Sequence, residues 1–185
     1  MQNKEIEIFY PTSVSAWREW LEQNCLSTQA VWLVYYSKSS GKPTISWSEA
    51  VDVALCFGWI DSKRVKIDSE TSHQYFTKRK AKSTWSRVNK DKIEQLTAAG
   101  LMTHTGLKSV EIAKQNGSWT ILDSIEALEI PEILELAFSQ TNGSKQKFQA
   151  LSKSKQKLML YGLKAAKTIP TKEKRIGEIL EALLN

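Results

Sequence analysis

The sequence predicts an α+β protein with a small, mainly antiparallel sheet and packed helices in residues 1–120, followed by an all-helical region at residues 121–185. Three observations lead to this fold class. Short segments rich in β-branched and aromatic residues lie before residue 78. A capped amphipathic segment lies among them, and from Ser83 onward the spacing is helical. The 41% hydrophobic content of the 185 residues suffices for a packed core.

Three segments are expected to form the sheet. Ala30 to Tyr36 carries Val and aromatic residues and predicts a largely buried strand. Trp59 to Ile67 and His73 to Thr77 flank a turn at Asp68 to Thr71, which predicts a hairpin. The preceding polar segment, residues 1–11, is expected to be extended.

The helix between these strands has clear start and stop signals. Ser46 followed by Glu49 is a capping box, in which the Ser hydroxyl and the Glu carboxylate each accept a backbone N–H. Gly58 can adopt positive φ at low cost and is expected to end the helix that begins at Trp47. An earlier helix is expected to end near Asn24.

The remainder of the chain is predicted to be helical, with a boundary near residues 119–123. Break and cap signals separate these helices. Their expected ranges are 86–100, 103–115, 131–138, 154–166 and 171–184. Residues 123–135 hold five acids and no base, whereas residues 145–185 hold ten bases and three acids. Either the acidic helix packs beside the basic ones, which is the favoured interpretation, or a basic face is left for an anionic partner.

Composition limits the classes of protein and of site. The net charge of +6 and pI near 9.2 permit contact with nucleic acid, anionic lipid or acidic proteins. The start of the chain does not resemble a signal peptide and no apolar stretch is long enough to span a membrane, so the expected location is cytoplasmic. Cys25 and Cys56 have no metal-binding spacing, so two reduced thiols, no metal and no cofactor are expected.

The candidate ligand site lies in the basic segment 78–92, which holds seven Lys or Arg and one acid. Arg offers a planar fork to phosphate or carboxylate, and the helix that starts near Ser86 adds its N–H groups and positive dipole end. Asp61 is expected nearby, where it could orient Arg79. The predicted ligand-binding residues are Asp61, Arg79, Lys80, Ser83, Trp85, Ser86 and Asn89.

Several of these side chains also have purely structural interpretations. Trp85 either stacks on a ligand or anchors the loop to the core. Asp61 either acts as a general base, orients Arg79 or simply caps a turn, and the structural role is favoured. Cys56 as a nucleophile would need a base such as His73, and a small buried hydrophobic role is favoured.

Two parts of the chain, one at 46–89 and one near its end, carry a family resemblance. The residues that carry it are Glu49–Val51, Cys56–Asp61, Phe76, Thr77, Arg79, Lys80, Ser83, Trp85, Ser86, Asn89, Ala166, Lys167, Thr171, Arg175 and Ile176. On these residues the chain resembles the YdeI/OmpD-associated (OmdA-like) family of bacteriocin-protection proteins. Lys78 replaces the family's usual Pro, Ser62 its common Gly, and Lys172 stands where Arg is usual in the closing segment.

No recognisable catalytic signature occurs in the sequence, so three function classes stay open. The first, implied by the resemblance, is a cytoplasmic, non-catalytic binding protein that protects against bacteriocins or envelope stress and takes an anionic ligand or acidic partner. The second is a nucleic-acid-binding module, favoured by the charge and by Trp85 in its basic loop. The third is an enzyme that uses Asp61, Arg79 or Cys56 on a small anionic substrate.

Overall fold

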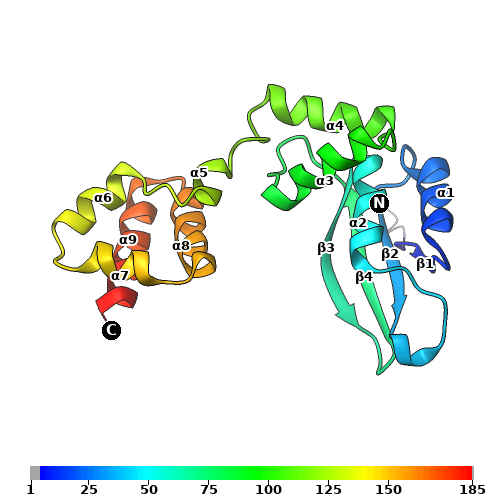
Figure 1. Cartoon of the computed structure of the whole chain (residues 1–185), viewed down its shortest axis with the longest axis horizontal. Helices are drawn as coiled ribbons and strands as arrows, with labels where there is room; N and C mark the ends of the chain where they lie inside the picture. The colour runs from blue at the N-terminus through cyan, green and yellow to red at the C-terminus, as the bar shows by residue number, and fades with distance from the viewer. Residues whose placement is uncertain (1–4, 185) are drawn as a thin grey trace. The chain divides into compact units, whose positions relative to one another are not determined.

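A computed structural model describes residues 5–184 of the chain (Figure 1). It divides into two compact units, one ending at Thr120 and the other beginning at Ile121. The first unit is α+β and the second is helical, which confirms the predicted fold class. Each unit has its own hydrophobic core.

The sheet of the first unit is mixed and mostly antiparallel. Its strands are β1 (Ile8–Phe9), β2 (Ala30–Tyr36), β3 (Trp59–Lys66) and β4 (Thr71–Lys78), in the order β1-β2-β4-β3. The predicted hairpin forms as β3 and β4, and β4 also pairs with β2 in antiparallel register. The short edge strand β1 is parallel to β2, a pairing that the sequence did not predict because two residues carry too little pattern.

Two helices of the first unit begin at well-formed caps. Ser13 Oγ accepts the Ala16 N–H 3.1 Å away and starts α1 (Val14–Asn24). The predicted capping box starts α2 (Trp47–Cys56), with both hydrogen bonds formed. Gly58 has φ of 72°, so it can reverse the chain after α2 without the steric cost that a side chain would bring.

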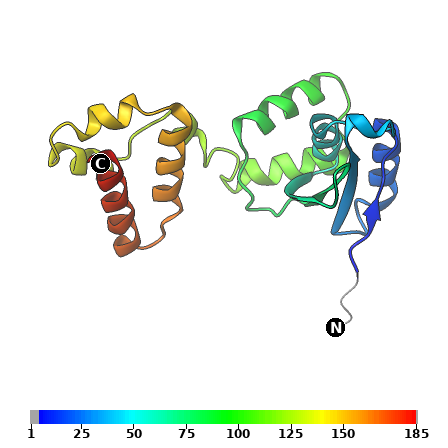
Figure 2. The same ribbon diagram turned by 90° about the horizontal axis from the view of Figure 1, so that it is seen from below.

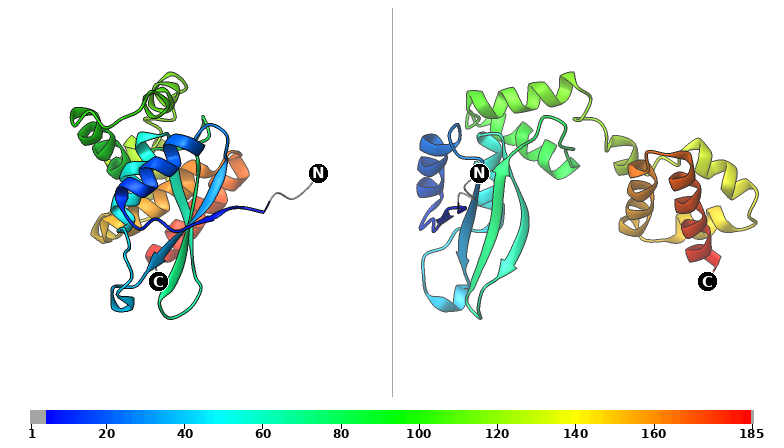
Figure 3. Two further views of the ribbon diagram at one scale, coloured as in Figure 1. Left: turned by 90° about the vertical axis from the view of Figure 1, so that its right-hand side faces the viewer. Right: turned by 180° about the vertical axis from the view of Figure 1, so that it is seen from behind.

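The core of the first unit lies between these helices and one face of the sheet. Trp17 of α1, Trp59 of β3 and Phe76 of β4 are all fully buried. The Trp17 indole donates to the Ala50 carbonyl of α2 at 3.0 Å, which joins the two helices by a buried hydrogen bond. Figure 1 shows α2 in front of the strands, and in the view from behind (Figure 3, right) the strands lie in front of α2.

Two further helices, α3 (Arg87–Ala98) and α4 (His104–Gln115), complete the first unit. Lys92 of α3 forms an ion pair with Asp52 of α2, which joins the two helices. Gly106 of α4 faces the end of α2 so closely that an added Cβ would lie 2.1 Å from the Cys56 carbonyl oxygen. Glycine is therefore required for this contact.

The second unit consists of helices in its described part, as the yellow-to-red segment of Figure 2 shows. Two of its helices, α5 and α7, were not predicted because each is short and its apolar spacing gives few periods to count. The helices are α5 (Asp123–Glu126), α6 (Glu132–Ser139), α7 (Ser144–Ala150), α8 (Lys153–Ala165) and α9 (Ile169–Leu184).

Acidic and basic residues of the second unit pair with one another. Lys145 of α7 contacts Glu135 of α6 at 2.8 Å, and Lys157 of α8 pairs with Glu126 of α5. These contacts agree with the interpretation in which the acidic segment packs beside the basic helices. Part of the basic charge of this unit is therefore neutralised internally.

Candidate functional site

Arg79 begins the basic loop and is held from several directions. Its backbone N–H donates to the Gly58 carbonyl at 2.9 Å, which ties the loop to the turn between α2 and β3. Its guanidinium carbon lies 3.6 Å from the centre of the Trp85 ring. Nη1 donates to the Thr84 carbonyl at 3.1 Å. The chain thus folds back so that a cation at the end of β4 lies over an aromatic ring six residues later.

The guanidinium of Arg79 is partly buried and forms no ion pair with an acidic residue of the described chain, residues 5–184. Its Nε is buried and has no hydrogen-bond partner. Burial lowers the pKa of Arg79 to about 10, and the negative charge of Asp61 opposes this shift without cancelling it. A guanidinium in this state favours the approach of an anion.

Asp61 does not hold Arg79 by a hydrogen bond. Its Oδ2 instead accepts the indole N–H of Trp47 at 2.8 Å and the side-chain amide of Gln74 at 3.2 Å. Gln74 also donates to the Ser62 carbonyl at 3.0 Å, so the carboxylate is fixed to both the N-terminus of α2 and the centre of the sheet. Asp61 therefore influences Arg79 only through the negative charge of its carboxylate, without a hydrogen bond.

Trp85 lies in the core. It is 1% exposed, and its ring centre is 5.0 Å from that of Trp119. This corrects its predicted place on the lining of an open site: a ligand would meet the guanidinium that covers the Trp85 ring, not the ring itself. Its neighbours in sequence, Ser83 and Ser86, are only partly buried, so the pattern of small polar residues around Trp85 did not reveal its burial.

The remaining predicted residues lie along the loop and the start of α3. Lys80 is exposed, and its carbonyl accepts the Ser83 N–H at 2.9 Å to form a turn. Ser86 is the N-cap of α3 and accepts the Asn89 N–H at 3.3 Å. The Ser86 hydroxyl is therefore already used as a cap, and what the start of α3 offers to an anion is chiefly the positive end of the helix dipole.

Residues outside the prediction shape the loop. Asn116 and Ser118 donate to the Ala81 carbonyl at 2.7 Å and 3.2 Å and anchor the loop to the end of α4. Trp47, which is 47% exposed, reaches Asp61 from the first turn of α2. The Asn-Gly pair at 116–117 is a turn signal in the sequence, but nothing in the sequence indicates that this turn lies beside residue 81.

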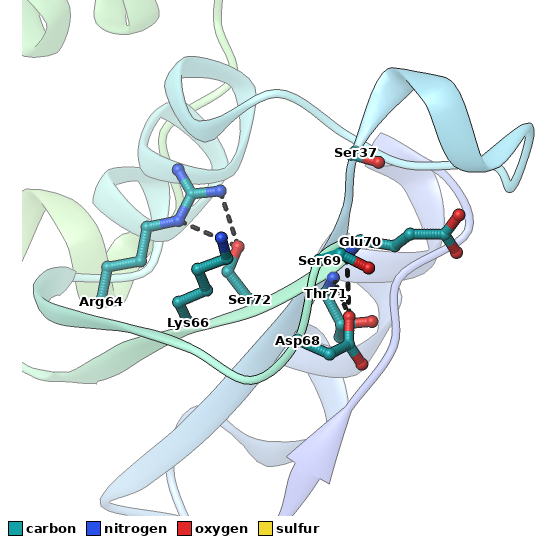
Figure 4. A pocket seen from close by; sticks show the side chains of 8 residues that line it. All are labelled: Ser37, Arg64, Lys66, Asp68, Ser69, Glu70, Thr71 and Ser72. Atoms are coloured by element: carbon teal, nitrogen blue, oxygen red, sulfur yellow. Dashed lines mark hydrogen bonds between the residues drawn. The ribbon is translucent and has the colours of Figure 1, made fainter.

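A polar pocket of about 430 Å³ lies at the tip of the β3–β4 hairpin (Figure 4). Arg64 donates twice to the Ser72 hydroxyl, at 3.0 Å and 2.6 Å. Asp68 Oδ1 accepts the N–H groups of Glu70 and Thr71, which closes the turn and lowers the pKa of Asp68. Arg64, Ser72 and Asp68 thus find their partners within the hairpin, and the pocket follows from the turn that they form.

The structure gives no support to an activated thiol or a metal centre. Cys25 and Cys56 are free and buried, and burial raises the pKa of the Cys56 thiol, which disfavours the reactive thiolate. No group of three His, Cys, Asp or Glu residues in the described part of the chain could hold a metal ion. Within residues 5–184, no helix has the length and apolar character needed to cross a membrane.

Comparisons with known proteins divide the chain in a similar way. Residues 9–109 match a domain of unknown function, DUF8412, and residues 127–185 match the family described as bacteriocin-protection, YdeI or OmpD-associated. The segment 46–89, which suggested the resemblance, falls within the first match, whereas the closing segment at 166–176 falls within the second. Searches of curated proteins and of solved structures found no match. The chain therefore belongs to the DUF8412 family, whose model covers more than half of it, and carries at residues 127–185 a domain that matches the bacteriocin-protection, YdeI or OmpD-associated family.

Proposed function

We propose that this chain is a non-catalytic binding protein whose N-terminal unit takes a small anionic ligand at Arg79. The observation that carries the proposal is the partly buried guanidinium of Arg79, which forms no ion pair among the described residues and whose buried Nε has no hydrogen-bond partner. A buried cation without a counter-ion is costly, and proteins usually pair it. A bound phosphate or carboxylate would supply the missing charge.

The surroundings of Arg79 suit such a ligand. The Trp85 ring and the Thr84 carbonyl hold the guanidinium in one place, so little side-chain entropy would be lost on binding. Lys80 and Lys82 are exposed in the same loop and add to its positive charge. Asp61 lies near enough to influence Arg79 without blocking it by an ion pair.

The biological setting is inferred from the family that the C-terminal unit matches. The description of the C-terminal family points to protection against bacteriocins, and we infer that anion binding by the N-terminal unit serves that protection. Cells that lack the gene should become more sensitive to a bacteriocin, and the wild-type gene should restore resistance. If Arg79→Gln restores resistance equally well, the anion site has no part in protection.

Thermal unfolding with inorganic phosphate or citrate tests the binding itself. A ligand at 100 times its Kd stabilises the native state by about 2.7 kcal/mol, so the unit's melting temperature should rise in the wild type. Arg79→Gln should abolish the rise. Arg87→Gln is the matched control, because Arg87 is an exposed guanidinium in the adjoining helix that pairs with Asp91. An equal rise in wild type and Arg79→Gln, or an equal loss in both variants, would contradict the proposal.

A further inference from the structure

One face of the sheet carries a row of aromatic side chains that no described helix of the first unit covers. In the view from behind (Figure 3, right), β2, β4 and β3 lie in front of α2. Trp32 of β2 is paired directly with Tyr75 of β4, and the next pair on the same face joins Val34 to His73. Strand alternation places these side chains opposite the buried Val31, Leu33 and Phe76.

The rings form a continuous surface. The ring centres of Trp32 and Tyr75 are 4.7 Å apart, and His73 lies 6.4 Å from Trp32. All three side chains are partly exposed. Ile8 of β1, which is 60% exposed, and Val65 of β3, which is 41% exposed, extend the surface to both edges of the sheet. An apolar and aromatic patch that spans four strands is larger than the scattered apolar residues of an ordinary surface.

The charge on this face is positive. The ammonium of Lys63 lies 5.2 Å from the Trp32 ring and 5.6 Å from the Tyr75 ring, and that of Lys42 lies 4.3 Å from the Tyr36 ring. None of the described strand residues that the register assigns to this face is acidic. Lys63 is placed on this face by its contacts with the two rings, and the residues that the register assigns to the face are Ile8, Ala30, Trp32, Val34, Tyr36, Ile60, Val65, Thr71, His73, Tyr75 and Thr77.

We propose that this aromatic face binds single-stranded nucleic acid. Unpaired bases would stack on Trp32 and Tyr75, and Lys63 would leave the rings to contact a phosphate. Stacking platforms bordered by cations are how proteins bind single strands with little sequence preference. A duplex would bind less well, because the faces of its bases are hidden in the helical stack. The site is separate from the Arg79 loop and does not depend on it.

Fluorescence anisotropy with a labelled strand of about 12 nucleotides tests the proposal on the full chain. Single-stranded DNA and RNA should bind at about 50 mM salt, and the affinity should fall steeply as salt is raised. Trp32→Leu and Tyr75→Leu should each weaken binding about 5- to 150-fold, the loss expected for one stacked base. Lys63→Gln should lower the slope of log K against log salt by about 0.7.

Controls separate this site from other causes of binding. Tyr161→Leu removes a 50% exposed aromatic ring from α8 and should leave binding unchanged, as should Arg79→Gln. Lys63 is exposed, so its variant keeps the test decisive if Trp32→Leu fails to fold. Absence of single-strand binding, equal affinity for duplex, or full affinity in Tyr75→Leu would overturn the proposal. Self-association that Tyr75→Leu abolishes, without nucleic acid binding, would show instead that the face is a protein interface.

Discussion

Replacing Trp85 by alanine tests whether this residue anchors the basic loop to the core. Trp85 is 1% exposed, contacts Trp119 and carries Arg79 over its ring. Truncation of a buried Trp costs about 3–5 kcal/mol. Unfolding entropy is about 2.1 cal/mol/K per residue, or about 0.25 kcal/mol/K for a unit of ~120 residues, so the melting temperature should fall by about 12–20 °C.

Intrinsic fluorescence is the suitable assay for this change. All seven Trp residues lie at or before position 119, so Trp fluorescence follows only the first unit, whereas far-UV circular dichroism also follows the helices of the second. Val88→Ala is the control, because Val88 is 58% exposed at the start of the adjoining helix and should change stability by about 0.5 kcal/mol or less. A fall of less than about 5 °C for Trp85→Ala would refute the anchoring role.

Two further predictions concern the helices. Gly106→Ala should lower the stability of the first unit by more than about 2 kcal/mol, because the added Cβ would lie 2.1 Å from the Cys56 carbonyl oxygen. Gly177→Ala, inside α9, should stabilise the second unit by about 0.5–1 kcal/mol, because the added Cβ meets no atom within 4 Å. Urea unfolding of both variants measures these opposite changes. Hydrogen bonds from Ser46 lower the pKa of Glu49, so the ionised carboxylate stabilises the fold above the ordinary glutamate pKa of 4.5, and this contribution is lost as pH falls through the lowered value. The stability of Glu49→Gln should therefore change less than that of wild type between neutral pH and pH below 4.5. The same loss of stability with acid in both proteins would show that the Glu49 carboxylate of the capping box does not contribute to it.

The sequence by itself determined the features that depend on near neighbours. The Ser46–Glu49 capping box needs only residues three apart, and both of its hydrogen bonds form as predicted. The Val-rich strand at 30–36 and the hairpin that follows α2 have enough alternation and turn chemistry to be found from local pattern. The short elements β1, α5 and α7 were missed because each carries too few residues for a period to be counted.

Contacts between distant residues were decided only by the tertiary structure. Local sequence places Trp85 among cations and serines, but its ring packs against Trp119 and is buried in the core, while Asn116 anchors the same loop at Ala81. Asp61 bonds to Trp47 and Gln74 instead of Arg79, because sheet register and the start of α2 bring those two donors to its carboxylate. The aromatic face is likewise invisible in sequence, since Trp32, Lys63 and Tyr75 meet only when three strands pair in one register. Side-chain alternation can be read along a strand, whereas which strands become neighbours depends on burying the whole core at once.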